Sequence, residues 1–301
     1  MLRRNFLIAF TLLFGLLAPV HAQAQFRSDR ISVTTSGSGP DVVLIPGLGS
    51  SPRVWEGLVQ ALPGYRYHLV QVKGFAGAPS EGNAGDGPVA APVAEEVARY
   101  IGEAIRGPAA IVGHSMGGSI GMMIAARHPE RVSRLMIVDM FPFVGAMFMP
   151  NATVESVRPI GAQIRGSIES SSEEAYRQQI TGTIASMVAT ESMRERAFQD
   201  SVTSDRNVSA RAFEELIVTD LRPELRNIRV PTRVLYVTPR GAPLTDAQLD
   251  EYYRLSYANL SGVQLQRVAG SAHFIMYDQP ELFVQEVRNF LSGIPGRGER
   301  G

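Results

Sequence analysis

The chain has 301 residues, of which 45% are hydrophobic and 19% are charged, a composition typical of a globular protein long enough for one large α/β domain. Lysine plus arginine and aspartate plus glutamate both number 29, so no charge excess points to nucleic acid as a partner. The absence of cysteine excludes disulfides, a thiol nucleophile, thiolate metal ligands and a lipoprotein anchor.

The first 22 residues have the organisation of a secretion signal. A basic start, MLRRN, precedes the apolar run FLIAFTLLFGLLAPV, and a small-x-small cleavage pattern ends at Ala22. The apolar run is short for a membrane span, so an uncleaved anchor is the less favoured alternative. We predict a signal peptide over residues 1–22 and a periplasmic or secreted mature protein with no stable membrane anchor. Arg3 and Arg4 match a twin-arginine signal only in part, which leaves the export route open.

Strands and helices are expected to alternate through the mature chain. Short apolar or alternating runs bounded by glycine or proline indicate strands over residues 30–37, 41–47, 67–74, 109–115, 133–140, 232–239 and 263–270. Helical patterns follow most of them, at residues 52–62, 91–105, 117–129, 246–258 and 280–291. This alternation predicts an α/β fold, in which a mostly parallel, twisted sheet carries helices on both faces.

The alternation stops between about residues 141 and 227. Helical patterns occupy this stretch at residues 154–164, 172–189, 192–202 and 209–221, with no strand pattern between them. We interpret it as a helical cap inserted into a single domain that spans residues 23–301. The Met and Phe side chains of residues 140–150, which open the cap, either line an apolar pocket or attach the cap to the core.

A serine between glycines follows the predicted strand over residues 109–115. The stretch GHSMGG begins at Gly113, after a buried strand and before a helix, which is the setting of a nucleophile elbow. The sharp turn requires small residues at Gly113 and Gly117, and it exposes the hydroxyl of Ser115 at the carboxyl edge of the sheet. The amides that open the following helix then face developing negative charge. Ser115 is therefore the candidate nucleophile.

Four stretches of the sequence resemble the α/β-hydrolase superfamily, and together they span nearly all of the mature chain. LIPGLGSSPRVW is similar to the oxyanion loop of that family, with Pro46 where histidine often stands, and GHSMGG to its elbow. ARHPERVSRLMIVD resembles the run into its sixth strand, and GSAHFIMYDQPELFVQEVRNFL its histidine loop and last helix. The resemblance implies a serine, acid and histidine in that order. It disfavours haloalkane dehalogenase and epoxide hydrolase activity, because those relatives carry aspartate where Ser115 stands.

His273 is the candidate general base. It lies in a predicted loop behind Gly270, Ser271 and Ala272, which leave room for an approaching ring. The other four histidines are expected to be cleaved with the leader or to be structural, and they are His21, His68, His114 and His128.

The sequence offers more than one candidate for the acid, the third partner. The family usually places its acid after the penultimate strand, but VTPRGAPLTD has no acid near Arg240. The family resemblance includes members with the acid at the end of the sixth strand, and Asp139 occupies that place. We favour Asp139, with Asp246 as the alternative, although Asp246 looks more like a helix N-cap. A serine–histidine dyad without an acid is the remaining possibility.

Two backbone amides are expected to form the oxyanion hole. They are the N–H of Met116, next after the nucleophile, and the N–H of Leu48, next after Pro-Gly. The sequence contains no phosphate loop and no metal-binding motif, so no cofactor and no metal are expected. The Gly- and Pro-rich residues 74–88 are predicted to form a surface loop near the site.

These features predict a serine esterase that cleaves a small or medium, largely apolar carboxylic ester through an acyl-enzyme. A C–C bond hydrolase, a lactonase or a cofactor-free haloperoxidase with the same triad is the alternative within the enzymes. A non-catalytic binding protein that keeps the fold is the alternative from another class. The partner is expected to be a small acyl substrate rather than nucleic acid.

Overall fold

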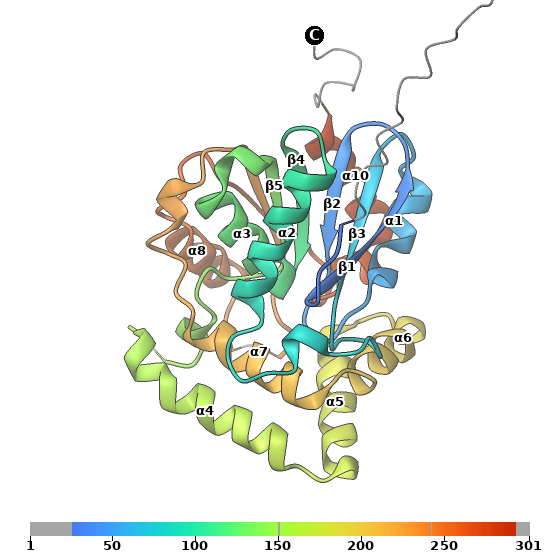
Figure 1. Cartoon of the computed structure of the whole chain (residues 1–301). Coiled ribbons are helices and arrows are strands. Elements are labelled where there is room, and N and C mark those ends of the chain that lie inside the picture. Colours follow the sequence, from blue (N-terminus) through green and yellow to red (C-terminus); the bar gives the residue numbers. More distant parts are fainter. Residues whose placement is uncertain (1–25, 150, 242, 293–301) are drawn as a thin grey trace, which may run out of the picture.

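A seven-stranded sheet forms the centre of the fold (Figure 1). The computed structural model describes residues 26–149, 151–241 and 243–292, so the predicted signal peptide lies outside the described residues. The strands are β1 (Ile31–Gly37), β2 (Asp41–Ile45), β3 (Arg66–Val72), β4 (Ala109–His114), β5 (Val132–Val138), β6 (Thr232–Tyr236) and β7 (Gln264–Arg267). Their order is β1-β3-β2-β4-β5-β6-β7, and every neighbouring pair is parallel except β1 with β3. The predicted α/β fold is confirmed.

Two layers of helices bury the sheet. The helices outside the cap are η1 (Pro52–Trp55), α1 (Glu56–Ala61), η2 (Glu81–Asn83), α2 (Ala90–Ala104), α3 (Met116–Arg127), η3 (Pro129–Arg131), α8 (Asp246–Ser256), α9 (Ile275–Asp278) and α10 (Pro280–Leu291). Apolar side chains of α2, α3 and α8 form one hydrophobic cluster with the sheet, and those of α1, α9 and α10 form a second. The central strands are covered on both faces, which explains why β2 and β4 are apolar without alternation.

The predicted helix over residues 52–62 is divided in two. Ser51 is the N-cap and Pro52 the first residue, as expected, but the first turn is a 3₁₀ helix and the α-helix begins at Glu56. Trp55, at the junction, is fully buried and stacks on Phe283 of α10 at 6.1 Å between ring centroids.

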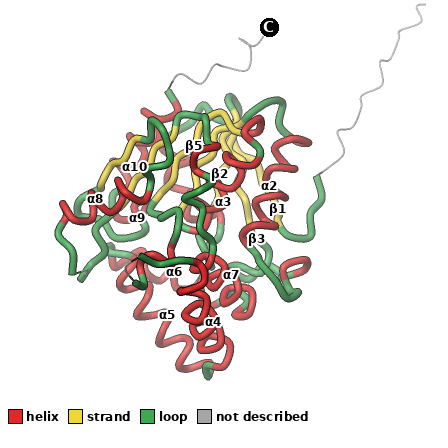
Figure 2. Tube along the Cα trace, turned by 90° about the vertical axis from the view of Figure 1, so that its left-hand side faces the viewer, coloured by secondary structure: helices red, strands yellow, loops and turns green. Residues whose placement is uncertain are grey.

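Between β5 and β6 the described chain is helical, and we call this stretch, about residues 141–227, the helical insertion. The elements are η4 (Val144–Met147), α4 (Val154–Ser170), α5 (Glu173–Met187), α6 (Glu191–Val202), α7 (Arg206–Val218) and η5 (Leu225–Asn227). Helices α4 to α7 lie together beyond one edge of the sheet, with α4 packed along α7 (Figures 1 and 2). Helix α7 begins three residues earlier than predicted, because the carboxylate of Asp205 accepts hydrogen bonds from the first amides of the helix. None of the helices in the described ranges is long and apolar enough to cross a bilayer.

A buried carboxylate of α7 connects these helices to the core. Glu215 accepts hydrogen bonds from the backbone N–H groups of Val89, Ala90 and Ala91, at 2.6, 2.6 and 2.8 Å. These amides open α2, whose own N-cap residue, Val89, has no side-chain acceptor. Glu215 therefore caps α2 from a distant part of the chain and satisfies amides that α2 cannot satisfy itself.

We predict that Glu215→Ala lowers the free energy of unfolding by about 2–3 kcal/mol, because it leaves buried amides without acceptors. Urea denaturation measures the change. Glu214→Ala is the matched control on the same helix, since Glu214 is partly exposed and pairs with Arg165 on the surface; it should cost less than about 1 kcal/mol. Equal small losses in the two variants would show that Glu215 does not hold α2.

Candidate active site

Ser115 lies on a strained turn between β4 and α3. Its backbone has φ 53° and ψ −123°, a region that non-glycine residues seldom adopt. A Cβ at Gly113 would collide with the backbone of Gly117, and a Cβ at Gly117 would collide with the end of β2. Both positions thus require glycine, and the elbow geometry expected from GHSMGG is present.

His273 and Asp139 are hydrogen-bonded to each other. The Nδ1 atom of His273 lies 2.6 Å from Oδ2 of Asp139, which accepts its hydrogen. Asp139 directly follows β5 and has a φ of 52°, a left-handed conformation that aspartate tolerates better than most residues. Its other oxygen, Oδ1, accepts from the N–H of Val237 at 3.1 Å and from the hydroxyl of Tyr253 at 3.2 Å. The carboxylate is therefore held from both sides.

Asp246 lies elsewhere. It is the first residue of α8, and Thr245 before it is the N-cap, so the expectation that Asp246 itself caps the helix is wrong by one position. Its carboxylate accepts from Thr238 at 2.6 Å and pairs with Arg267 at 2.7 Å. The carboxylate of Asp246 therefore bonds to Thr238 and Arg267, and the carboxylate that bonds to His273 is that of Asp139.

Tyr253 was not singled out by the sequence, which shows it only as one aromatic residue of a helix. It is fully buried, and its ring centroid lies 3.9 Å from that of Tyr236 and 4.2 Å from that of Phe141. Burial, and then the negative charge of Asp139, raise the pKa of Tyr253 well above its ordinary value. The hydroxyl therefore stays protonated and remains a donor to Asp139.

The two predicted oxyanion amides belong to two segments that adjoin the serine. Met116 is the first residue of α3, and Leu48 belongs to the loop after β2, where Gly47 approaches the side chains of Ser115 and His114. Among the described residues, neither amide has a hydrogen-bond acceptor in the protein. Both are free to donate to a bound oxygen.

His114, next to the serine, supports the histidine loop. It is buried, its ring centroid lies 4.6 Å from that of His273, and its Nε2 lies 3.1 Å from the backbone oxygen of His273. Burial, and then the proximity of His273, hold the pKa of His114 well below its ordinary value. The ring is therefore neutral and donates its Nε2 hydrogen to that carbonyl.

The remaining histidines in the described chain have structural partners, as expected. Buried His68 bonds to Tyr100 and Asp41, and His128 pairs with Glu95 at the surface. Burial opposes ionisation of Asp41, but hydrogen bonds from His68 and Arg66 outweigh it and lower the pKa of Asp41 to about 2. His21 lies outside the described residues.

Two cavities meet at Ser115 and His273. One, of about 220 Å³, extends under α5 and is lined by Leu48 and by apolar side chains of the helical insertion. The other, of about 430 Å³, extends past Asp139 toward Arg240. Side chains that line both are Ser115, Met187, Phe213, Leu216 and His273. The serine and the histidine thus lie where two largely apolar spaces join.

The segment that opens the insertion contributes to the larger cavity. Its lining includes Met140, Phe141, Val144, Met147 and Phe148. The glycine-rich residues 74–88 do not line either cavity, but the loop reaches the end of α6, where the N–H of Ala76 donates to the hydroxyl of Ser204 at 2.8 Å. The loop also contacts the start of α7, where Ser80 donates to Asp205 at 2.6 Å.

No group of three or more acidic or histidine side chains in the described ranges is arranged to hold a metal ion.

Residues 42–286 match the sequence model of the alpha/beta hydrolase family. The chain is an α/β hydrolase. Among its relatives, a pimeloyl-acyl-carrier-protein methyl ester esterase of Aeromonas hydrophila is 28% identical over 281 residues, which cover 87% of this chain and 99% of the relative. The enzyme of the same name from Edwardsiella ictaluri is 28% identical over 268 residues, covering 86% and 96%.

Solved structures share the fold of this α/β hydrolase. The enol-lactonase of Burkholderia xenovorans superposes with a TM-score of 0.69 at 21% identity, covering 87% of this chain and 96% of that one. A thermophilic esterase of Thermogutta terrifontis superposes with a TM-score of 0.67 at 18% identity, covering 87% and 92%. At these identities the likeness concerns the fold.

The buried neutral His114 gives a prediction for stability against pH. The pKa of His114 is lowered on folding. Below about pH 6.5, His114 therefore binds a proton in the unfolded chain but stays neutral in the folded protein. Stability should fall as the pH drops from 7 to 5, by up to about 1.4 kcal/mol per pH unit from this residue. Urea denaturation at each pH should show a shallower dependence in His114→Gln. An unchanged slope in His114→Gln would contradict the assignment.

Proposed function

We propose that this protein is a serine hydrolase that cleaves carboxylic esters through an acyl-enzyme on Ser115. The observation that carries the proposal is the hydrogen bond from His273 to Asp139 beside a serine on a strained elbow. The esterase relatives from Aeromonas and Edwardsiella support the same bond type.

In the first half of the proposed reaction, His273 takes the proton of the Ser115 hydroxyl. The serine oxygen attacks the ester carbonyl carbon, and the resulting oxyanion accepts hydrogen bonds from the amides of Leu48 and Met116. The bond to the alcohol oxygen then breaks, and the leaving alcohol takes the proton from His273. The product of this half is an acyl ester on Ser115.

In the second half, water enters in place of the alcohol. His273 removes a proton from the water, whose oxygen attacks the acyl carbon, and the oxyanion again forms against the two amides. The bond to the serine oxygen breaks, His273 returns its proton to Ser115, and the free acid leaves.

Asp139 serves this cycle by fixing the histidine. Its hydrogen bond keeps the proton on Nδ1, so Nε2 is the atom that exchanges protons with Ser115, and its charge stabilises the imidazolium. The donors on its other oxygen, from Val237 and Tyr253, keep the carboxylate oriented.

The two cavities support a small or medium, largely apolar substrate. Because both open onto Ser115, an ester carbonyl there has one space for its acyl part and another for its alcohol part. A volume of about 220 Å³ limits one of these parts to a short group, whereas about 430 Å³ accepts a longer one.

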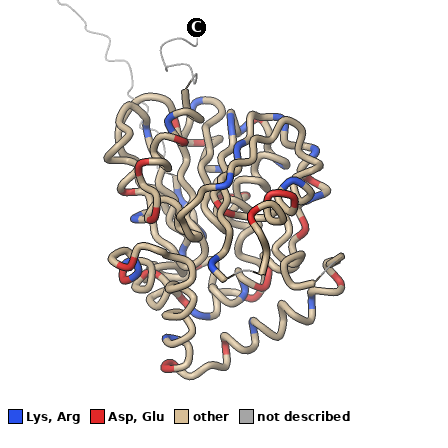
Figure 3. Tube along the Cα trace, turned by 180° about the vertical axis from the view of Figure 1, so that it is seen from behind, with Lys and Arg blue, Asp and Glu red and all other residues tan. Residues whose placement is uncertain are grey.

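We further propose that the mature enzyme acts in the periplasm or is secreted, without nucleic acid and without a stable membrane anchor. The signal-like residues 1–22 support export. Basic and acidic residues are interspersed along the chain (Figure 3) and equal in number, so the charge distribution gives no support to a nucleic-acid partner.

Ser115→Ala should abolish hydrolysis of p-nitrophenyl butyrate, because no other group then attacks the acyl carbon. Release of p-nitrophenol by the purified mature protein measures this, and a fluorophosphonate probe should label wild type but not the variant. Full turnover in folded Ser115→Ala would contradict the mechanism. Wild type that neither turns over esters nor takes the probe would instead indicate a binding protein.

Asp139→Asn should lower kcat by about 10⁴ while the protein stays folded, because the amide no longer selects the correct imidazole tautomer. Asp246→Asn is the matched control: it removes a carboxylate bonded to Thr238 and Arg267, and it should keep nearly all activity. If only the Asp246 variant loses activity, the acid has been assigned wrongly.

A further inference from the structure

The loop that carries the Leu48 amide makes one backbone hydrogen bond within itself among the described residues. It leaves β2 at Ile45, turns with Ser50 N–H donating to the oxygen of Gly47 at 3.2 Å, and reaches the 3₁₀ turn η1 at Pro52. Gly49 has a φ of 64°, in the left-handed region. Groups outside the loop therefore contribute to holding its amides in one position.

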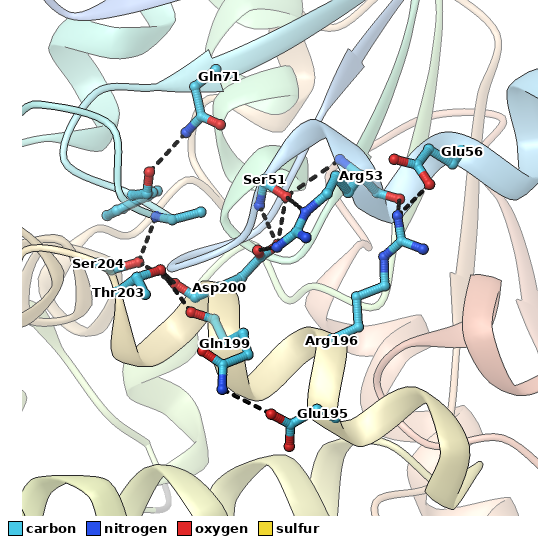
Figure 4. A network of polar contacts seen from close by, with 12 residues as sticks. Ser51, Arg53, Glu56, Gln71, Glu195, Arg196, Gln199, Asp200, Thr203 and Ser204 are labelled. Atoms are coloured by element: carbon cyan, nitrogen blue, oxygen red, sulfur yellow. Dashed lines mark hydrogen bonds and ion pairs between the residues drawn. The ribbon is translucent and has the colours of Figure 1, made fainter.

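Asp200, on α6, supplies that group. It is buried, and its Oδ2 accepts from both the N–H and the hydroxyl of Ser51, at 2.9 and 2.6 Å. Its Oδ1 pairs with Arg53, whose side chain is about half exposed. Figure 4 shows the carboxylate of Asp200 reaching from α6 to the end of the loop between Ser51 and Arg53.

Helix α6 is itself held in place beyond Asp200. Ser204 donates to the backbone oxygen of Asp200 at 2.8 Å and accepts from the N–H of Ala76 at 2.8 Å (Figure 4). The oxygen of Thr203 accepts from the N–H of Gly77 at 3.1 Å. These hydrogen bonds fix the backbone of α6 at Asp200. The carboxylate of Asp200 can therefore hold Ser51 in a defined position.

The same helix also covers the loop directly. A Cβ at Gly49 would lie 3.6 Å from the Cα of Ser201 and 3.6 Å from Oγ of Ser204, which is ordinary van der Waals contact. Leu48 and Ser201 both line the smaller cavity. Helix α6 thus lines the smaller cavity and also contacts the loop that carries the oxyanion amide.

We propose that Asp200 is a positioning residue for the oxyanion hole, through which the helical insertion sets the place of the Leu48 amide. The inference rests on the proposed function, since it assigns a role in that reaction. A backbone N–H stabilises the transition state only when it lies at the position of the oxyanion. Asp200 fixes the loop at Ser51, three residues from the Leu48 donor.

The inference predicts a loss in kcat rather than in KM. Removing an oxyanion donor altogether costs about 10²–10³ in kcat. Asp200→Ala leaves the donor present but loosely held, so kcat for p-nitrophenyl butyrate should fall about 10- to 100-fold, with KM changed less than about 2-fold since the apolar cavities remain. Asp200→Asn, whose carbonyl oxygen still accepts from Ser51, should recover most of the loss.

Asp205→Ala is the matched control. Asp205 is another carboxylate of the same insertion, caps α7 and accepts from Ser80, but it has no bond to the oxyanion loop. It should lower stability in urea and leave kcat within about 2-fold of wild type. A similar fall in kcat for Asp205→Ala and Asp200→Ala would mean that general loosening of the insertion, and not the bond to Ser51, is responsible.

An inhibitor series separates positioning from a merely structural role. Across wild type, Asp200→Asn and Asp200→Ala, the affinity of a trifluoromethyl ketone, which forms an oxyanion on Ser115, should fall in proportion to kcat/KM. The affinity of 1-butanol, a neutral ligand of the apolar cavities that forms no oxyanion, should stay constant. Unchanged ketone affinity, or kcat within about 2-fold of wild type in Asp200→Ala, overturns the inference.

Two further variants keep the result decisive. If Asp200→Ala does not fold, Ser51→Ala removes one of the two bonds to the loop and should lower kcat about 3- to 10-fold; an unchanged kcat overturns the inference. Ser115→Ala is assayed in parallel. Retained turnover in that variant would refute the proposed function itself, whereas its loss together with wild-type kcat in the Asp200 and Ser51 variants would refute only the role of Asp200.

Discussion

The site depends on one hydrogen bond, which joins Asp139 at the end of β5 to His273 in the loop after β7. The two residues are 134 positions apart in the chain, and β6 lies between their strands. Parallel strands end at the same edge of a sheet, so the fold brings both side chains to the edge where Ser115 stands. A carboxylate on β5 has to reach across β6, and the donors from Val237 and Tyr253 hold it in that extended position.

Several costly features of the structure are explained by this arrangement. Ser115 and Asp139 both have positive φ, and each stores backbone strain where a side chain must be presented at the sheet edge. His114 is buried with a pKa held well below its ordinary value, and its Nε2 hydrogen bonds to the backbone oxygen of His273. The helical insertion lines both cavities at the site and is bound to the core by buried carboxylates, Glu215 at α2 and Asp200 at Ser51.

The sheet and the elbow were predictable because their signals are local. Short apolar or alternating runs, most of them bounded by glycine or proline, mark all seven strands, and the six residues GHSMGG are enough to predict the turn at Ser115. The choice between Asp139 and Asp246 was not local, since it depends on which carboxylate lies next to an imidazole far along the chain. The bonds of Tyr253, Glu215 and Asp200 join segments more than 100 residues apart and follow no periodicity, so no pattern in the sequence marks them.

The hydrogen bond from His273 to Asp139 is most directly observed by proton NMR of the mature protein. A strong imidazole–carboxylate hydrogen bond shifts the Nδ1 proton far downfield, away from other signals. The account predicts one such resonance in wild type that disappears in both His273→Gln and Asp139→Asn and persists in Asp246→Asn. A resonance that survives Asp139→Asn, or that vanishes in Asp246→Asn, would contradict it.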